Sequence, residues 1–392
     1  MTLDTPIGTR SSAEPADTSL HPTPPSHHRF HLLDGLRGIA AFMVVLYHMP
    51  RFMCTFAHTA FLSVDFFFCL SGFVIGFSYE KRLLAGMRMK DFFAARIIRL
   101  YPTYLLAILL SLCLLLTSLN YPLTTSATLK LMALTVFQLG MLPNLHFWPG
   151  GYLFPLDRSA WSLFYELLAN IALAALIRKK LAGSRAMLLI TTVSFFLLLF
   201  LAIRGHGIQT GAENSWRHMY MGVTRVTLSF STGMLTLHLF HRTGRPALNL
   251  SLQRLIPVVL ITALIFILSG PIRAMQSSGF QILDVILLLP AVVYLGSLCT
   301  TPPGWTRLCI FLGNISYPVY LLQELLIGFL YKPSVMQLAI RHPHEALVAF
   351  LLLLTVVSHF AFQLYDFPVR SRLTQFYNER IRTPRTVDLL NA

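Results

Sequence analysis

Ionisable side chains recur inside a strongly apolar stretch near the start of the chain. The stretch Leu32 to Pro50 carries Asp34, Arg37 and His48. Each helical residue turns the chain by roughly 100°, so the eleven steps from Arg37 to His48 return to nearly the same side, and Asp34 precedes Arg37 by one turn. Such groups inside a membrane are costly unless they face a protein interior or a wet cavity. The stripe therefore predicts a functional site, with His48 as a base that titrates near neutral pH.

Two carboxylates lie in later apolar stretches. Ser162, Glu166 and Asn170 recur every four residues and form a second polar stripe. Because Glu166 lies one to two turns inside its stretch, a functional role is favoured over a structural ion pair. Asp65 shares a helix face with Gly72, seven residues later, which would let a neighbouring helix approach. Asp65 is expected either to meet a polar partner or to act as an interfacial anchor.

A pair of arginines opens another apolar stretch. Arg96 and Arg99 are three residues apart, so both guanidinium groups leave the same side of a helix and could clamp a phosphate. Positive residues are also expected at cytoplasmic helix ends for reasons of topology alone, which is the simpler explanation. Ser316, Tyr320 and Gln323 share a face of a late stretch, where polar side chains often only join helices.

These groups must be positioned by membrane helices. The chain has 392 residues, of which 55% are hydrophobic and 12% charged, the composition of an all-α polytopic membrane protein. We expect about ten transmembrane helices, at residues 32–50, 60–79, 97–118, 160–178, 185–203, 217–240, 254–270, 280–299, 308–330 and 345–366. Basic connections after the second and fourth spans, and a basic C-terminal tail, predict that both termini are cytoplasmic.

The remaining segments complete the predicted organisation. Residues 1–30, rich in Pro, Ser, Thr and His, are expected to be a disordered cytoplasmic tail without a cleavable signal. Residues 31–366 form the membrane domain, and residues 367–392 a basic cytoplasmic tail. The short apolar segment Thr128 to Leu142 is expected to be a re-entrant or interfacial helix within an outer-face excursion over residues 119–159, because a full span there would put the basic connections on opposite faces.

Composition also argues against several other classes. The net charge of +15 is carried mostly by short connections, so we expect no nucleic-acid partner. The five cysteines lack paired spacing, and no histidine pair has metal-like spacing with an acidic partner. We therefore expect neither a disulfide framework nor a metal site. The oligomeric state is left open by the sequence.

Five segments of the chain occur together in a recognisable order. They are Leu33-Asp34-Gly35-Leu36-Arg37-Gly38-Ile39-Ala40-Ala41 closing on Tyr47-His48, Val64-Asp65-Phe66-Phe67-Phe68 with Leu70-Ser71-Gly72-Phe73, Arg96-Ile97-Ile98-Arg99-Leu100-Tyr101-Pro102, Trp161-Ser162-Leu163 with Glu166, and Ile315-Ser316-Tyr317 with Tyr320-Leu321. In content and order they resemble the membrane-bound acyltransferase 3 family over residues 32 to about 366.

The resemblance implies a ten-span enzyme that uses cytoplasmic acyl-CoA, usually acetyl-CoA. Its acceptor is commonly a sugar hydroxyl on a lipid-linked or surface glycan at the outer face. The family's catalytic histidine matches His48, and its arginine pair on the CoA side matches Arg96 and Arg99. The chain departs from the family where Gln323 replaces a common histidine, and where Leu-Leu-Ala-Asn rather than Glu-Gln-Phe-Tyr follows Glu166.

These observations combine into one mechanistic hypothesis. His48 is the general base, oriented or polarised by Glu166 or Asp65. The acyl donor is held by Arg37, Arg96, Arg99 and Tyr101. The carbohydrate acceptor is contacted by Trp161, Ser162, Ser316 and Tyr317.

Three alternatives to direct transfer of the acyl group from acyl-CoA to the acceptor stay open. A two-step route through an acyl-histidine is compatible with the same residues. A secondary transporter would also have about ten spans with buried charges, although no helices broken at matched positions of two halves are evident. A flippase that moves a lipid-linked glycan without chemistry is the third. The expected location is a bacterial inner membrane.

Overall fold

The computed structural model describes residues 30–118, 124–144, 151–205, 207–209, 211–244, 249–301 and 303–379. The expected N-terminal tail, apart from residue 30, lies outside the described residues. So do the end of the expected C-terminal tail, from residue 380, and two parts of the expected outer-face excursion, residues 119–123 and 145–150.

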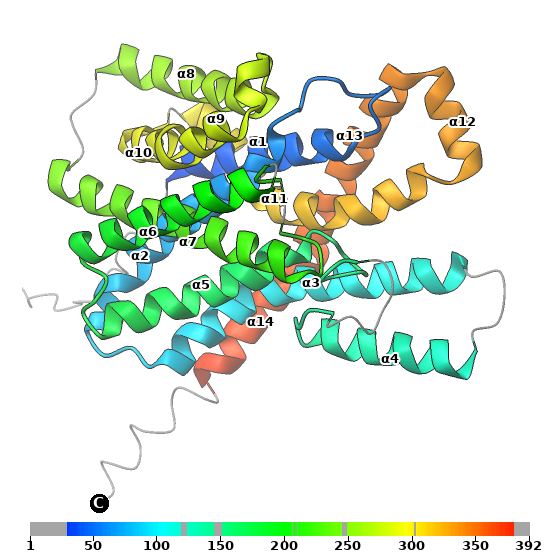
Figure 1. Cartoon of the computed structure of the whole chain (residues 1–392), viewed down its shortest axis with the longest axis horizontal. Coiled ribbons are helices and arrows are strands. Elements are labelled where there is room, and N and C mark those ends of the chain that lie inside the picture. The colour runs from blue at the N-terminus through cyan, green and yellow to red at the C-terminus, as the bar shows by residue number, and fades with distance from the viewer. Residues whose placement is uncertain are drawn as a thin grey trace, which may run out of the picture.

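The described residues form a bundle of long helices and no extended sheet, so the prediction of an all-α polytopic membrane fold is confirmed (Figure 1). The long helices are α1 (His31–His48), α2 (Ser63–Leu84), α3 (Met89–Ser118), α5 (Ala160–Arg178), α6 (Ser184–Gly205), α7 (Trp216–Thr243), α8 (Leu250–Ser269), α11 (Pro303–Leu330) and α13 (Pro343–Phe360). A further long segment joins α9 (Ser278–Leu283), the π-helix η3 (Asp284–Leu288) and α10 (Leu289–Leu298).

Eight helical segments of the described chain are long and apolar enough to cross a membrane. Helices α1 and α7 occupy the positions of the two other expected spans but are not in that group. Their polar residues explain this, because α1 carries Asp34 and Arg37, and α7 carries Arg225 among several serines and threonines. The polar helices belong in the interior of the bundle, where α7 buries Arg225.

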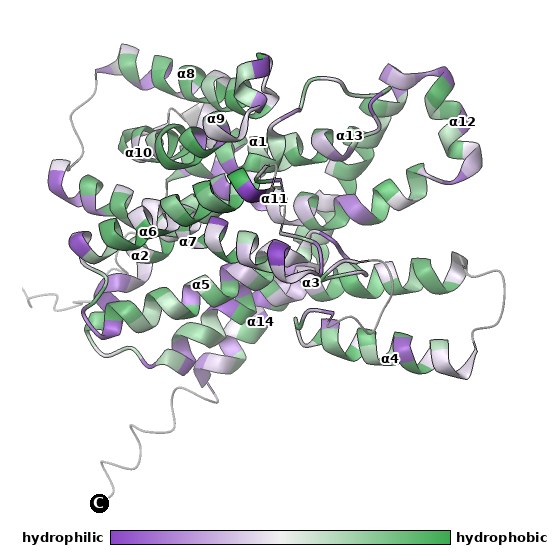
Figure 2. Cartoon of the chain, in the orientation of Figure 1, coloured by the Kyte–Doolittle hydropathy of each residue, from purple (hydrophilic) through white to green (hydrophobic). Residues whose placement is uncertain are grey.

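Apolar side chains cover the outside of the bundle. Helix α6 is buried over only 22% of its most apolar window and exposes Leu189, Phe196, Phe200 and Ile203. Figure 2 shows the same apolar colouring along much of the outer helices, with polar residues gathered mainly at helix ends and connections. A surface of this kind is matched to lipid chains and not to water.

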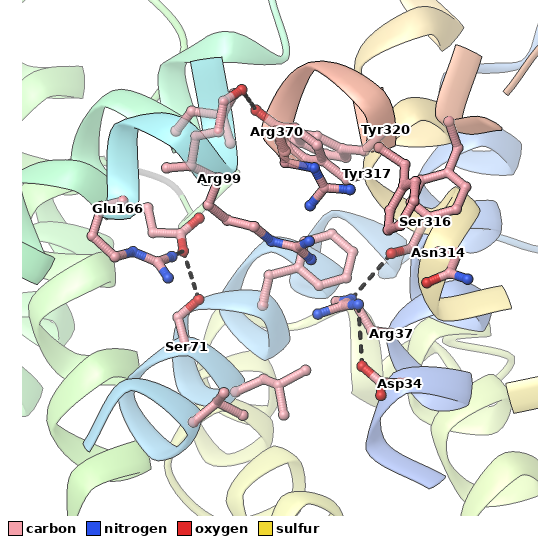
Figure 3. Close-up of a pocket in the computed structure, with 18 of the residues that line it drawn as sticks. Asp34, Arg37, Ser71, Arg99, Glu166, Asn314, Ser316, Tyr317, Tyr320 and Arg370 are labelled. Carbon is pink, nitrogen blue, oxygen red and sulfur yellow. Dashed lines mark hydrogen bonds and ion pairs between the residues drawn. The ribbon is translucent and has the colours of Figure 1, made fainter. Parts of the chain in front are cut away.

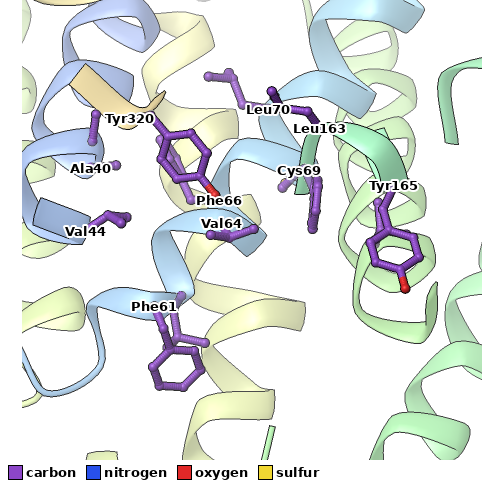
Figure 4. Packing of buried hydrophobic residues seen from close by; sticks show 14 of the residues in the cluster. Ala40, Val44, Phe61, Val64, Phe66, Cys69, Leu70, Leu163, Tyr165 and Tyr320 are labelled. Carbon is purple, nitrogen blue, oxygen red and sulfur yellow. The ribbon is translucent and has the colours of Figure 1, made fainter. Parts of the chain in front are cut away.

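Small residues bring the central helices into close contact. A side chain at Gly72 would clash with the backbone of Phe230 in α7, and one at Gly233 would clash with the backbone of Cys69 in α2. The expectation that Gly72 allows a helix to approach is therefore confirmed. Large buried residues such as Phe66 and Tyr165 belong to the same packed interior (Figure 4).

Helices α1 and α11 pack side by side and run in the same direction. Gly35 meets Cys309, Gly38 meets Leu312, and His48 at the end of α1 meets Glu324 farther along α11. We call the end of the bundle where α1 and α11 begin the near end, and the end where α1 finishes the far end. Successive spans cross a membrane in alternating directions, so the expected order of ten spans predicts that the first and ninth spans run in the same direction.

Two shorter helices and the chain end complete the fold. Helix α4 (Thr125–Leu139) forms where a re-entrant or interfacial helix was expected, and α12 (Pro333–Arg341) precedes α13. Helix α13 continues without a break through the π-helix η4 (Ala361–Asp366) into α14 (Phe367–Tyr377). Part of the expected C-terminal tail is thus an ordered helix, which packs against α3 at the near end.

Candidate active site

A cavity of about 1470 Å³ lies among α1, α2, α3, α5, α11 and the η4–α14 segment (Figure 3). It is larger than the roughly 300–1,000 Å³ usual for small-molecule sites, and so suits a long ligand. Its polar lining includes Asp34, Arg37, Ser71, Arg96, Arg99, Glu166, Asn314, Ser316, Tyr317 and Arg370. Polar residues from six segments far apart in the sequence therefore meet at one place.

Arg37 is fixed in the wall of this cavity by α1 and α11. Its Nε donates to Oγ of Ser316 at 3.0 Å, and a terminal nitrogen donates to the carbonyl of Gly313 at 3.0 Å. Asp34 lies one turn earlier, 3.2 Å from the guanidinium. The charge of Arg37 is thus balanced and its orientation set, which makes it a rigid part of the cavity wall.

Glu166 and Arg96 form a second polar group on the opposite wall. Oε1 of Glu166 accepts a hydrogen bond from Ser71 at 2.7 Å and one from Arg96 at 3.4 Å. The Nε of Arg96 is buried with no hydrogen-bond partner among the described residues. A buried donor left unsatisfied is unfavourable, so this nitrogen is a candidate to bind an anion.

Arg99 differs from the other arginines of the cavity. Its guanidinium lies within the cavity in Figure 3, and no carboxylate in the described part of the chain pairs with it. Arg37, Arg96 and Arg370 each have an acidic partner, respectively Asp34, Glu166 and Asp366. Among the four arginines, Arg99 is therefore the one that an anionic ligand could bind without competing with an ion pair of the described residues.

A layer of packed and hydrogen-bonded side chains lines the cavity on its far side. The hydroxyl of Tyr320 lies 2.9 Å from Oγ of Ser162 and donates to the carbonyl of Ser159 at 3.2 Å. The ring of Phe67 packs edge-on against Tyr320, with centroids 5.7 Å apart. Phe67, Ser162 and Tyr320 all line the cavity, so this layer forms part of its wall on the far side.

His48 lies beyond that layer, at the far end of α1. Its Nδ1 is 2.9 Å from the carbonyl oxygen of Val44, which can only accept a hydrogen bond. Nδ1 therefore carries the hydrogen, and Nε2 keeps the lone pair that a general base needs. The side chain of His48 is 35% exposed, which leaves it accessible from the far end.

Glu324 is the carboxylate that faces His48. Its Oε1 lies 4.0 Å from Nε2 of His48, while its Oε2 accepts two hydrogen bonds from Arg158, at 3.0 and 2.8 Å. The neighbouring Asp157 is buried, accepts a hydrogen bond from the backbone of Ser159 at 3.0 Å, and has one oxygen without a partner among the described residues. Burial raises the pKa of Asp157 well above its usual range, and the charge of Glu324 adds to this.

Neither Asp65 nor Glu166 lies beside His48, where a carboxylate partner of the base was expected. Asp65 is fully buried and forms an ion pair with Arg225, with 2.5 Å between the closest atoms, and accepts a further hydrogen bond from Ser229. It does not line the cavity. Glu166 lines the cavity but is bound to Ser71 and Arg96. The structure thus gives His48 a different carboxylate neighbour.

The remaining predicted site residues fall into two groups. Ser162, Ser316 and Tyr317 line the cavity, and the hydroxyl of Tyr317 donates to the carbonyl of Leu100 at 2.7 Å. Tyr101 and Trp161 do not line it: Tyr101 donates to the carbonyl of Leu139, and Trp161 packs edge-on against Tyr165.

Sequence reasoning missed three residues of this region. Glu324 and Arg158 form the ion pair beside His48, and Arg370 lines the cavity from α14. Glu324 carried a detectable signal, since it is a carboxylate in an otherwise apolar span. Arg158 lies in a connection and Arg370 in an expected tail, so nothing in the sequence pattern linked either one to the site.

Comparison with known proteins shows the family to which the chain belongs. Residues 30–362 match the family model described as an acyltransferase domain, acyltransferase 3. A curated relative, "Protein 2 in picA locus" of Rhizobium radiobacter, is 36% identical over 157 residues, which are 37% of this chain and 81% of the relative. No solved structure matches. The match over most of the chain shows that this protein belongs to the acyltransferase 3 family and is an acyltransferase of the membrane.

Proposed function

We propose that the protein transfers an acyl group, most simply acetyl, from cytoplasmic acyl-CoA to a hydroxyl group of a carbohydrate acceptor at the opposite face of the membrane. The observation that carries this proposal is the relation between the cavity and His48. The cavity runs from the near end of the bundle to Tyr320, and Glu324, the neighbour of His48, follows Tyr320 by one helical turn.

The dimensions of the cavity support a coenzyme A thioester as donor. Ile310 and Tyr320 both line the cavity and are ten residues apart in α11, which corresponds to about 15 Å of helix, or half of the roughly 30 Å hydrocarbon layer. An extended pantetheine arm can cross such a distance. Its phosphates would remain near Arg99 and the Nε of Arg96, neither of which has an acidic or hydrogen-bonding partner, respectively, among the described residues. The residues present therefore fit this donor.

The chemistry assigned to His48 follows from its hydrogen bond to Val44. Nε2 accepts the proton of the acceptor hydroxyl while the hydroxyl oxygen attacks the thioester carbonyl carbon. The carbon–sulfur bond then breaks, and the proton passes from the imidazolium to the departing thiolate of coenzyme A. Glu324, held by Arg158, faces Nε2 and stabilises the imidazolium while it exists.

The layer at Tyr320 separates the two substrates until they meet. Tyr320 and Glu324 differ by four residues, or about 6 Å along the helix axis. The thioester would arrive from the near side of this layer and the hydroxyl from the far side. Rotation of the Tyr320 side chain away from Ser162 would join the cavity to His48, and the freed phenol could then donate a hydrogen bond to the oxyanion.

The expected orientation places the near end in the cytoplasm. Arg82, Arg96 and Arg370 are at this end, as the positive-inside rule predicts for a cytoplasmic surface. The far end, with His48 and Arg158, would then face the periplasm of a bacterial inner membrane. The choice of a carbohydrate as the acceptor rests on the membership of the acyltransferase 3 family.

The proposal is tested with purified protein in lipid nanodiscs, supplied with acetyl-CoA labelled in the acetyl group. Transfer of label to a glycan acceptor, or slow release of label as acetate, supports the enzyme. Movement of a glycan or of acetyl-CoA across the bilayer without any change of the label would contradict it and favour a flippase or a transporter. The same assay with His48→Gln identifies transfer that depends on the proposed base.

A further inference from the structure

A second cavity of about 400 Å³ adjoins the first at the near end of the bundle. Its walls are the last turns of α2, the first turns of α3, and α14. The two cavities share the lining residues Arg96, Arg99, Arg370, Thr374 and Asn378. A ligand that occupies the large cavity can therefore extend one end into the small one.

Positive charge from three helices gathers in the small cavity. Arg82 of α2 and Arg99 of α3 both line it, and neither pairs with a carboxylate in the part of the chain that the structure describes. Arg370 of α14 pairs with Asp366, but a guanidinium has five N–H donors, and one carboxylate does not use them all. With Arg96, which also lines this cavity, four guanidinium groups surround it and form a site for phosphate groups.

A flat surface lies beside these arginines. The guanidinium of Arg82 stacks over the ring of Tyr79, 5.1 Å from its centre, and both residues line the small cavity. Phe92 also packs edge-on against Tyr79, with ring centroids 5.1 Å apart, and so helps to hold the Tyr79 ring in place. Stacked aromatic and guanidinium planes are the surfaces on which proteins bind nucleobases.

Helix α14 is held firmly enough to form a wall. The hydroxyl of Tyr377 donates to Asp91 at 2.8 Å, and Asp91 also accepts two hydrogen bonds from Arg88, at 2.8 and 2.9 Å. At the other end of the helix, Oγ1 of Thr103 donates to Asp366 at 2.6 Å. These contacts hold α14 at both of its ends against α3 and the connection that precedes α3.

We propose that the small cavity binds the phosphorylated nucleoside end of the donor, and that α14 is a required part of this site through Arg370. The inference rests on the proposed function, because it assumes a coenzyme A thioester in the large cavity. It extends that function to a helix beyond residues 30–362, the segment that the family model matches. Arg82 and Arg370 bind phosphate groups together with Arg99, and the stacked side chains of Arg82 and Tyr79 receive the nucleobase.

The test measures the affinity of the full chain for free coenzyme A, in phosphatidylcholine nanodiscs, by isothermal titration calorimetry. Dephospho-coenzyme A, which lacks the 3′-phosphate, and pantetheine, which lacks the whole nucleotide, serve as truncated probes. We expect affinity to fall in that order. Arg370→Gln and Arg82→Gln should each lower the affinity for coenzyme A about tenfold. Both variants should bind pantetheine with the affinity of the wild type. Both should also lose part of the preference for coenzyme A over dephospho-coenzyme A.

Matched variants separate this role from folding and from lipid binding. Arg372→Gln, an exposed arginine of α14 outside both cavities, should bind coenzyme A like the wild type. Arg370→Lys, which keeps the charge, should recover part of the affinity. If Arg370→Gln alters thermal stability only in nanodiscs with anionic lipid and leaves coenzyme A affinity unchanged, the arginines bind lipid headgroups and the inference is wrong.

The outcomes also distinguish the inference from the function on which it rests. A wild type that binds no coenzyme A overturns both. A wild type that binds coenzyme A through Arg99, with unchanged affinity in both Arg370→Gln and Arg82→Gln, keeps the proposed function and overturns the inference.

Discussion

Nε2 of His48 faces Oε1 of Glu324 at 4.0 Å, and the other oxygen of Glu324 is bound by Arg158. The carboxylate thus comes from α11, the helix that packs against α1 in the same direction, and its orientation is set by the loop before α5. Glu324 is 10% exposed, so its charge acts on His48 with less screening than at an open surface. This pairing gives His48 a stabilising partner that neither Glu166 nor Asp65 supplies.

Replacement of Glu324 should affect the chemical step more than binding of the donor. Glu324→Gln is expected to lower kcat about tenfold or more, because the imidazolium formed on proton transfer loses its counter-charge. The KM for acetyl-CoA should change little, since Glu324 does not line the donor cavity. Glu324→Asp, which keeps the charge, should retain more activity than Glu324→Gln. An unchanged kcat in Glu324→Gln would remove this residue from the mechanism.

Asp65 should prove more important for stability than for chemistry. Asp65→Ala leaves the guanidinium of Arg225 buried without its partner, and breaking such a pair costs about 3–5 kcal/mol. Thermal unfolding in detergent would show this as a lower Tm. The double variant Asp65→Ala, Arg225→Ala should recover part of the loss, because no unpaired charge remains. A fully stable but inactive Asp65→Asn would instead indicate a direct catalytic role.

The buried Asp157 makes stability depend on pH. Because the pKa of its carboxyl is raised in the folded protein, the folded state binds the proton more tightly than the unfolded state does. The associated stability is complete below the unfolded pKa and decreases as pH rises toward the folded value. Asp157→Asn should therefore have a higher Tm than the wild type at pH 8, with a smaller difference at pH 5. Equal differences at both pH values would show that Asp157 does not titrate in this range.

Arg96 and Arg99 should respond differently to the same substitution. Arg99 has no carboxylate partner among the described residues, so Arg99→Gln should raise the KM for acetyl-CoA about tenfold without lowering the Tm. Arg96→Gln should raise the KM and lower the Tm, because the substitution also removes the charged hydrogen bond that Arg96 donates to the partly buried Glu166. If neither substitution changes the dependence on acetyl-CoA, the two arginines serve topology alone.

Much of the fold could be predicted from the sequence, because long apolar runs and their basic flanks determine membrane helices directly. The small residue Gly72 also pointed correctly to a close helix contact. Side-chain pairing could not be predicted in the same way, since it depends on how helices far apart in sequence are rotated against each other. Asp65 meets Arg225, 160 residues away, and nothing in the local pattern of either helix identifies the other.

The candidate site shows the same division. Arg37, Arg96, Arg99 and Glu166 line one cavity, although the spacing of the two arginines alone favoured a role in topology and Glu166 was expected beside His48. Glu324 was visible as a carboxylate within a span, but its neighbour could be known only once α1 and α11 were placed side by side. The basic residues after residue 366 resembled a tail, because a short polar helix has no apolar periodicity to mark it. The assignments of catalytic and binding roles stay predictions until measured.

The most direct test of the account is a single-turnover assay of His48→Gln, with labelled acetyl-CoA and a glycan acceptor fraction from cells that express the protein. The account predicts that the variant folds, binds coenzyme A with wild-type affinity, and transfers acetyl groups at least about 100-fold more slowly than the wild type. Transfer at the wild-type rate by a correctly folded His48→Gln would contradict it.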